Sequence, residues 1–132
     1  MDCIFCKIVE GIIPAKKIYE DKKNVAFLDI NPMVDGHTIV APKQHVEEFY
    51  QLNAEDYGSL MGVIKKIAGV IKKMYNPFRV GVVVYGFDVS HAHVHLYPNT
   101  GKEVTMHHVL DYSESKLDQE LKKLKNFIIN DK

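Results

Sequence analysis

Hydrophobic residues recur at helical spacing in two stretches of the chain. The first predicts a long helix that begins after Asn53, a good N-cap with Asp56 three residues on, and stops at Asn76-Pro77. Its apolar stripe faces a core and consists of Leu60, Ile64, Ile67, Ile71 and Met74. The second predicts a terminal helix over residues 115–128, with an apolar side formed by Leu117, Leu121, Leu124 and Ile128.

Shorter runs rich in β-branched and apolar residues predict strands. They cover residues 17–19, 24–28, 37–41, 79–84 and 91–98. The run 79–84 is almost continuously apolar, which favours a strand buried on both faces or central in the sheet. Before the first strand, residues 3–9 predict a helical or turn-like segment. The order β-β-β-α-β-β-α predicts an α+β fold with a mainly antiparallel sheet of about five strands.

The last predicted strand carries three histidines, His91, His93 and His95, which alternate with apolar residues. The two-residue period of a strand places the three imidazoles on one face, roughly 6.6–7 Å apart. Each neutral imidazole has a donor and an acceptor to satisfy, so a row of three is poor core packing. Three surface histidines on a half-solvated sheet face are the less favoured explanation. Catalysis, metal binding or both are the alternatives.

Composition narrows the class of protein. A chain of 132 residues with 46% hydrophobic and 26% charged residues predicts one domain, 1–132, with its own core. Seventeen basic residues balance seventeen acidic ones, which gives no electrostatic reason to expect a nucleic-acid or membrane partner. The start of the chain lacks a basic signal-like region, and no apolar run reaches membrane-spanning length. We therefore expect a cytoplasmic protein, with the nucleus as a further compartment.

The two cysteines, Cys3 and Cys6, form a Cys-x-x-Cys pair at the start of the chain. A redox role needs a preceding strand, for which residue 3 leaves no room. Two buried thiols or half of a zinc site remain. Two cysteines and two histidines are a common structural zinc set, and His45 and His91 are the candidate nitrogen donors.

The histidine row itself admits two chemistries. A His-x-His pair such as His91 and His93 can hold a catalytic zinc with a third ligand from elsewhere. Alternatively, one imidazole acts as a nucleophile and forms a covalent phosphorus–nitrogen bond, while its other nitrogen donates to an acceptor that fixes the tautomer. Neighbouring imidazoles on that face can donate to phosphate oxygens or to the leaving group.

Together these residues resemble the histidine triad (HIT) family of nucleotidyl hydrolases and transferases, and its small Hint-like branch in particular. The resemblance covers roughly residues 2–100 and rests on segments in the same order and spacing: residues 3–15, 19–21, 26–32, 36–38, 42–45 and 91–98. It implies a HIT-like fold with one long central helix and a C-terminal helix. Because such proteins are commonly homodimers, it also implies a second copy as partner. The apolar stripe of residues 60–74 suits that interface or an internal core equally.

The resemblance implies roles for individual residues. His93 attacks the α-phosphorus of a purine nucleotide such as an AMP derivative, and His95 lies beside the phosphate as an acid or hydrogen-bond donor. Asp29 binds the ribose hydroxyls. The residues that match the apolar walls around the base are Ile4, Phe5, Ile8, Ile13, Phe27 and Ile30; for Ile8 and Ile30 a plain core role is an equal alternative. The implied ligands of a structural zinc are Cys3, Cys6, His45 and His91.

The chain departs from the family in the loop before the histidines. Residues 84–90 replace a longer loop that contacts phosphate, and Asp88 puts a negative charge where an anion is expected to bind. Ser90 could still offer a hydroxyl or backbone N–H to the nucleotide. Residues 101–132 form a C-terminal extension outside the resemblance, in which His107 and His108 are expected to be exposed polar residues.

These observations lead to one main hypothesis and three alternatives. The main hypothesis is hydrolysis of a nucleoside 5′-phosphoramidate or related nucleotidyl bond through a nucleotidyl-histidine at His93, with release of a nucleoside monophosphate. The first alternative is hydrolysis of a dinucleoside polyphosphate. The second is a nucleotide- or partner-binding module with little turnover, and the third is catalysis by a zinc held by His91 and His93.

Overall fold

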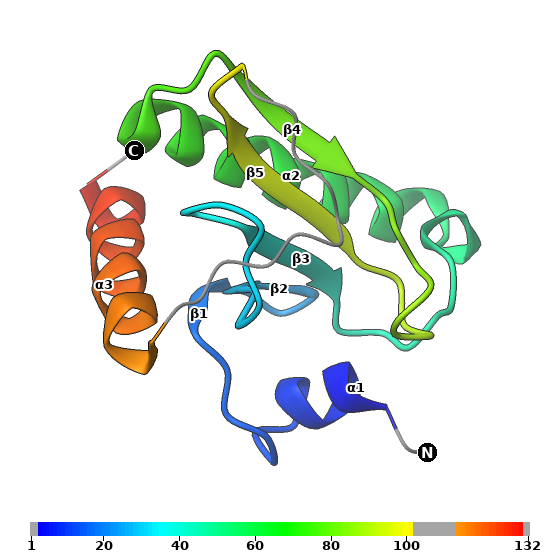
Figure 1. The fold of residues 1–132 in the computed structure, drawn as a ribbon. Coiled ribbons are helices and arrows are strands. Elements are labelled where there is room, and N and C mark those ends of the chain that lie inside the picture. The colour runs from blue at the N-terminus through cyan, green and yellow to red at the C-terminus, as the bar shows by residue number, and fades with distance from the viewer. Residues whose placement is uncertain (1–2, 102–112, 131–132) are drawn as a thin grey trace.

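The computed structural model describes residues 3–101 and 113–130. Its elements, in chain order, are α1 (Ile4–Val9), β1 (Lys17–Glu20), β2 (Asn24–Leu28), β3 (Thr38–Pro42), the 3₁₀ turn η1 (Phe49–Gln51), α2 (Ala54–Tyr75), β4 (Arg79–Val83), β5 (Val94–Asn99) and α3 (Glu114–Asn130). Figure 1 shows a single sheet with α2 behind it, α3 beside β1, and α1 below. The predicted α+β class is confirmed. His107 and His108 lie outside the described residues.

Within the described residues, the sheet has five strands in the order β1-β2-β3-β5-β4. Every neighbouring pair is antiparallel. β5 therefore lies between β3 and β4, although β4 precedes it in sequence, and Ile39 on β3 pairs with His95. This order brings the histidine segment to the middle of the sheet.

The long helix α2 begins and ends where local signals predicted. The Asn53 side chain accepts a hydrogen bond from the Asp56 backbone N–H at 2.8 Å, which caps the first turn. At the other end Asn76 adopts a left-handed conformation with φ of 46°, before Pro77. The predicted stripe packs against the sheet, with Ile67 and Ile71 fully buried. This stripe therefore belongs to the internal core.

Strand alternation divides the buried side chains between two layers. On the face covered by α2, the core includes Ala26 and Leu28 of β2 together with Val94 and Leu96 of β5. On the opposite face, a smaller cluster joins the N-terminal segment to the sheet and consists of Cys3, Phe5, Ile8, Val25, Phe27, Ile39 and Ala41. All three histidines of the row lie on this second face and are buried.

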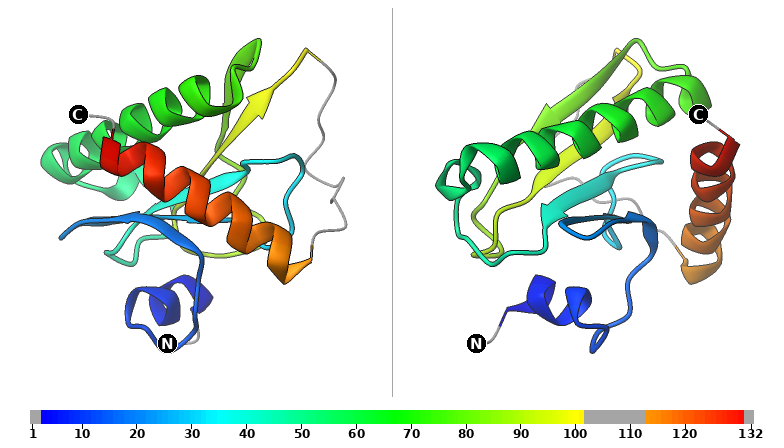
Figure 2. Two further views of the ribbon diagram at one scale, coloured as in Figure 1. Left: turned by 90° about the vertical axis from the view of Figure 1, so that its left-hand side faces the viewer. Right: turned by 180° about the vertical axis from the view of Figure 1, so that it is seen from behind.

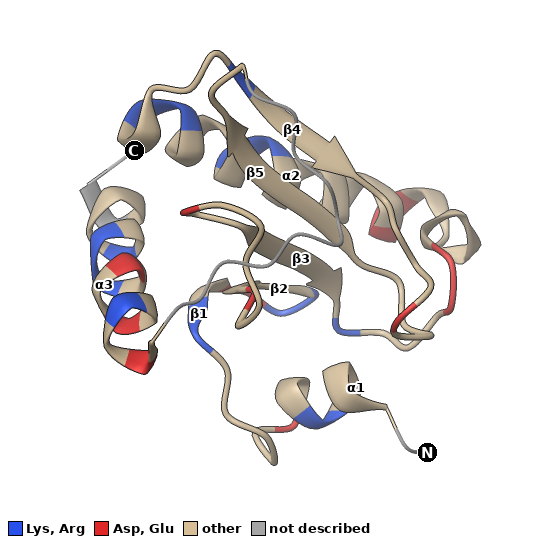
Figure 3. Ribbon diagram, in the orientation of Figure 1, with Lys and Arg blue, Asp and Glu red and all other residues tan. Residues whose placement is uncertain are grey.

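The terminal helix α3 packs against β1 and α2 (Figure 2). It starts one residue earlier than predicted, because the Ser113 hydroxyl accepts a hydrogen bond from the Lys116 backbone N–H at 3.1 Å. Lys16, just before β1, reaches Glu114 at 2.9 Å and Asp118 at 2.7 Å. Figure 3 shows basic and acidic residues interspersed along the ribbon of α3, in keeping with the balanced charge of the sequence.

Two details of the predicted strands are wrong. The segment 79–84 is not buried on both faces or central: β4 is an edge strand that pairs with β5 alone among the described strands, and Val82 is 51% exposed. Of its valines, Val80 packs against the core that α2 covers, whereas Val82 stays largely outside it. The histidine strand also begins later, at Val94. Before it, the Ala92 backbone N–H donates to the Val46 carbonyl instead of to a neighbouring strand.

Among the residues of the two described ranges, no helix combines the length and the apolar character needed to cross a bilayer.

Candidate active site and metal centre

Four side chains from three parts of the chain meet below the sheet. Cys3 and Cys6 come from the start of α1, His45 from the segment after β3, and His91 from the segment before β5. His91 Nδ1 lies 3.4 Å from Cys3 Sγ, 3.6 Å from Cys6 Sγ and 3.2 Å from His45 Nδ1. Cys6 Sγ lies 3.3 Å from His45 Nδ1. The structure therefore brings together all four predicted metal ligands.

The donor set and its geometry fit zinc. Two nitrogens bound to a tetrahedral zinc at its usual bond lengths are about 3.3 Å apart, close to the 3.2 Å between His45 and His91. His91 Nε2 donates to the Pro42 carbonyl at 2.8 Å, which leaves Nδ1 with its lone pair toward the group. Burial lowers the pKa of His91, which keeps it neutral and able to coordinate. Burial is the largest cause that raises the pKa of the Cys6 thiol, and the neighbouring Cys3 thiol raises it further. A bound cation would lower this pKa instead.

His93 is held in one tautomer by the chain itself. Its Nδ1 donates to the His91 carbonyl at 2.6 Å, so Nε2 carries a free lone pair. The ring stands edge-to-face on Phe5, with centroids 4.8 Å apart. His91 therefore has two roles: its Nδ1 belongs to the metal group, and its carbonyl orients His93. A fixed lone pair on a ring nitrogen is what a nucleophile requires.

His95 is oriented by a residue that the sequence analysis did not select, His37. The Met33 backbone N–H donates to His37 Nδ1 at 3.1 Å, so His37 carries its proton on Nε2. His37 Nε2 then donates to His95 Nδ1 at 2.8 Å, which places the His95 proton on Nε2. His37 lies in the 36–38 segment that supports the family resemblance. Its sequence distance from His95 gave no sign that the two rings would touch.

Burial sets the charge of both rings. It lowers the pKa of His37 to about 4 and that of His95 to about 4, with the proximity of His37 adding to the shift in His95. Both are therefore neutral near pH 7, and His95 offers a neutral N–H donor instead of a charged acid.

Asp29 follows β2 and completes this side of the site. Its Oδ1 accepts from the Asn31 backbone N–H at 2.8 Å, and its Oδ2 lies 3.6 Å from His37 Nε2. Burial raises the pKa of Asp29. Asp29, His37 and His95 are also close enough to one another to hold a cation. However, the 2.8 Å between the two ring nitrogens is a hydrogen-bond length and is too short for two nitrogens on one tetrahedral zinc, which lie about 3.3 Å apart.

The alternative of a catalytic zinc on His91 and His93 has no support in this geometry. His93 Nδ1 is engaged by a carbonyl. Within the described ranges, neither group of residues that could hold a metal combines His91 with His93.

The predicted apolar walls lie in different environments. Phe5, Ile8 and Phe27 are buried in the cluster between α1 and the sheet, and the Phe5 and Phe27 rings stand edge-to-face at 5.5 Å. Ile13 packs at the margin of that cluster. Ile30 is 64% exposed, so it is not a core residue. Ile4 is half-exposed.

A cavity of about 760 Å³ opens beside the metal group and the outer apolar wall. Ile4 and Ile13 line it, as do Ser90 and Asp88 from the short loop before His91. Glu47 and Lys7 supply further charged side chains to its rim. The predicted nucleotide contact Ser90 is therefore exposed in this cavity next to Asp88, whereas His93, His95 and Asp29 are not among the residues that line it.

Comparisons with known proteins agree with this arrangement. Residues 10–102 match the HIT domain. An uncharacterized HIT-like protein of Methanocaldococcus jannaschii is 39% identical over 127 residues, which cover 93% of this chain and 98% of that protein. The adenosine 5′-monophosphoramidase of Schizosaccharomyces pombe is 38% identical over 105 residues, 78% of each chain.

A solved structure extends the likeness to three dimensions. The crystal structure of a Zn-bound histidine triad family protein from Mycobacterium smegmatis matches with a TM-score of 0.84 and 26% identity, and covers 98% of this chain and 94% of that one. Since the domain match spans most of the sequence and the fold agrees, this chain belongs to the histidine triad (HIT) family.

Proposed function

We propose that this chain is a nucleotide hydrolase that cleaves a nucleoside 5′-phosphoramidate, or a related nucleotidyl bond, and releases a nucleoside monophosphate. The observation that carries the proposal is the fixed tautomer of His93, whose Nδ1 donates to the His91 carbonyl and whose Nε2 lone pair is free. The relationship to adenosine 5′-monophosphoramidases supports the choice of substrate.

In the proposed first step, His93 Nε2 attacks the α-phosphorus. A bond forms between that nitrogen and phosphorus, the bond from phosphorus to the leaving amine breaks, and the amine takes up a proton from water. The imidazole becomes positively charged, and the His91 carbonyl stabilises that charge through its hydrogen bond to Nδ1. Water then attacks phosphorus and gives up a proton to the hydroxide left in solvent by the first step, and His93 leaves with its lone pair restored. Mass spectrometry of protein quenched during turnover tests this step directly, because it detects a nucleotidyl adduct on His93.

We assign His95 the role of a neutral donor to a phosphoryl oxygen. Its Nε2 proton is fixed by the chain of hydrogen bonds through His37 to the Met33 backbone. A neutral N–H that is already aimed at the oxygen gains strength as negative charge develops there, without a change in protonation.

The remaining predicted residues form the nucleotide pocket in this proposal. The Asp29 carboxylate accepts from the vicinal hydroxyls of a ribose, and it keeps one oxygen available because Asn31 occupies the other. A purine base lies against the apolar wall formed by Phe5, Ile8, Ile13, Phe27 and Ile30, near Ser90. Phe5 also contacts His93, so the same ring connects the base pocket to the nucleophile.

The proposed zinc is structural. Cys3, Cys6, His45 and His91 would hold it, and it would fix the N-terminal segment to the strand that carries the catalytic histidines. His93 and His95 perform the chemistry.

Asp88 favours the phosphoramidate over a dinucleoside polyphosphate. Burial raises the pKa of Asp29, and the negative charge of Asp88 adds to that shift; Asp88 also opposes the burial-induced lowering of the pKa of His95. Asp88 therefore acts electrostatically on both sides of the phosphoryl site. A polyphosphate carries more negative charge into this field than a phosphoramidate does.

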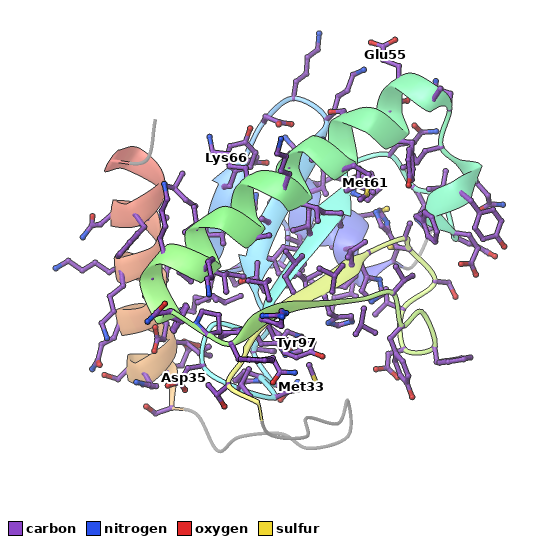
Figure 4. All side chains as sticks on the ribbon, turned by 90° about the horizontal axis from the view of Figure 1, so that it is seen from above. Met33, Asp35, Glu55, Met61, Lys66 and Tyr97 are labelled. Atoms are coloured by element: carbon purple, nitrogen blue, oxygen red, sulfur yellow. The ribbon has the colours of Figure 1, made fainter. Side chains whose placement is uncertain are left out.

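We expect Asp88→Asn to raise kcat/KM for a diadenosine polyphosphate about 3- to 10-fold, because the extra negative charges of that substrate are no longer repelled by a carboxylate in a partly screened site. The value for adenosine 5′-phosphoramidate should change much less. Glu55→Gln is the control, because Glu55 is an exposed carboxylate at the start of α2 (Figure 4). Equal changes in kcat/KM for both substrates would show that Asp88 does not determine which substrate the site prefers.

We also propose a homodimer through the exposed edge of β4 and the outer side of α2. Val82 and Val84 on or beside β4 are half-exposed, as are Tyr57 and Met61 on α2. Figure 4 looks down on the molecule from above and labels Met61 on α2. Light scattering should give about twice the 15.1 kDa of the chain, and Val82→Lys should shift the mass to that of a monomer. A monomeric wild type would contradict this assignment.

A further inference from the structure

A hydrogen-bonded pair of a half-buried tyrosine and a buried carboxylate joins the C-terminal helix to the end of α2. The Tyr75 hydroxyl, on the last residue of α2, donates to Glu120 Oε2 on α3 at 2.8 Å. The Glu120 side chain is 4% exposed, and its other oxygen lies 3.3 Å from Lys116 Nζ. Burial and the hydrogen bond to Glu120 raise the pKa of Tyr75, so the hydroxyl keeps its proton and remains the donor. Neither residue has a role in the proposed chemistry.

The ring of Tyr75 lies directly on the backbone of Gly36. A Cβ at residue 36 would approach ring atoms of Tyr75 to 2.7 Å, and the φ of Gly36 is 84°. Only glycine fits both that conformation and that contact. Tyr75 therefore sets the position of the chain at residue 36, and Glu120 sets the position of Tyr75.

Gly36 immediately precedes His37, the residue that orients His95. The backbone N–H of His37 donates to the Val34 carbonyl at 3.2 Å, and its carbonyl accepts from the Asp29 N–H at 3.0 Å. The loop between β2 and β3 thus carries Asp29 and His37 as one hydrogen-bonded unit, and Tyr75 is packed beneath it. Met33 and Asp35 of the same loop are labelled in Figure 4.

Beside this contact the structure has room for the ring to move. A cavity of about 320 Å³ is lined by Tyr75, by Val34 and Asp35 of the loop, and by residues at the end of β5. Without its hydrogen bond to Glu120, the Tyr75 ring could shift into that space, and the loop that rests on it could follow.

We propose that Tyr75 and Glu120 are positioning residues for the active site, through which α3 holds the loop that carries Asp29 and His37 in register with His95. The role of His95 rests on the proposed function. The position of the loop and the hydrogen bond between His37 and His95 do not depend on which reaction is catalysed.

The test compares Tyr75→Phe with Tyr19→Phe. The control residue Tyr19 also donates to a carboxylate, Asp21 Oδ2, at 2.8 Å, but it lies on β1. Each variant loses one hydroxyl and one hydrogen bond of the same length, so similar small decreases in Tm are expected. For Tyr75→Phe alone, kcat for adenosine 5′-phosphoramidate should fall about 5-fold, within the range for residues that act on a site at a distance. KM should rise as well, because the same loop carries Asp29, the proposed ribose ligand.

Side-chain nitrogen NMR supplies the readout that a purely structural role would not move. In the wild type, the ring signals of His37 and His95 should both report the Nε2–H tautomer, with His95 Nδ1 as a hydrogen-bond acceptor. Tyr75→Phe should shift the His95 Nδ1 signal, and Tyr19→Phe should leave it in place. Glu120→Gln keeps an acceptor oxygen and should retain most of the wild-type kcat and His95 signal.

Identical His95 signals and kcat values in the two tyrosine variants would overturn the proposal. If Tyr75→Phe does not fold, Glu120→Leu provides the same comparison from the α3 side. If the wild type does not cleave the phosphoramidate, the proposed function fails, while the NMR comparison still decides whether Tyr75 positions His37 and His95.

Discussion

Replacement of His93 with alanine should lower turnover of adenosine 5′-phosphoramidate by about 10⁴-fold or more, the scale of loss when a catalytic nucleophile is removed. The reason is specific to this site. His93 Nε2 has a lone pair that is fixed by the bond from Nδ1 to the His91 carbonyl, whereas burial and His37 hold His95 with a proton on Nε2. No other imidazole of the triad can therefore replace the nucleophile. Rapid-quench assays of AMP release measure the effect.

The same variant should still bind AMP, since Asp29 is held by the Asn31 backbone and Phe5, which packs on the His93 ring, is also held by Phe27. Calorimetric titration should give affinities for the variant and the wild type within a few-fold of each other. The adduct seen by mass spectrometry should disappear with the variant. Tight AMP binding by a wild type that forms neither adduct nor AMP would identify a nucleotide-binding module. Undiminished turnover by the variant would place the nucleophile elsewhere.

Loss of the metal group should have the largest effect on stability. A site loaded at about 1,000 times its Kd adds about 4 kcal/mol to the free energy of unfolding, which corresponds to a change in Tm on the order of 10 °C for a domain of this size. Cys6→Ser, or a strong chelator added to the wild type, should lower Tm by that order. Elemental analysis should find one zinc per wild-type chain and substantially less in Cys6→Ser.

His93→Ala is the matched control for this experiment, because His93 lies outside the four-residue metal group. It should keep its zinc, and its Tm should still fall by the same order when chelator is added. Addition of zinc should restore the chelated wild type but not Cys6→Ser. A wild type that contains no zinc and whose Tm does not respond to chelator would show that the two thiols and two imidazoles are only a buried polar cluster.

Local signals in the sequence predicted local structure well. The bounds of α2 depend on Asn53, Asn76 and Pro77, each of which acts within a few residues of its own position, and the structure has the helix between them. The alternation of histidines with apolar residues likewise held, since Val94 and Leu96 face the α2 core. The HIT family and its fold were also predicted correctly.

Features that depend on distant neighbours were harder to predict. The run of valines in β4 predicted a buried strand. Whether a strand is central depends on the order of strands in the sheet, and that order is not encoded in the run of valines. His37 was not selected, because its role arises only when β3 pairs with β5. That pairing brings His37 Nε2 to 2.8 Å from His95 Nδ1, although the two residues are 58 positions apart in the sequence. The contact of Tyr75 with Gly36 also joins residues far apart in the sequence, so no local signal predicted it.

The hydrogen bonds from Met33 through His37 to His95 all run in one direction. A ligand atom that meets His95 Nε2 must therefore be an acceptor. A ligand that presented a hydroxyl donor there would require both rings to move their protons, and the Met33 N–H would then face a protonated nitrogen inside the protein. For inhibitor design, fully ionised oxyanions and sulfonyl or phosphonyl oxygens suit this position, and alcohols that can donate only toward the ring do not.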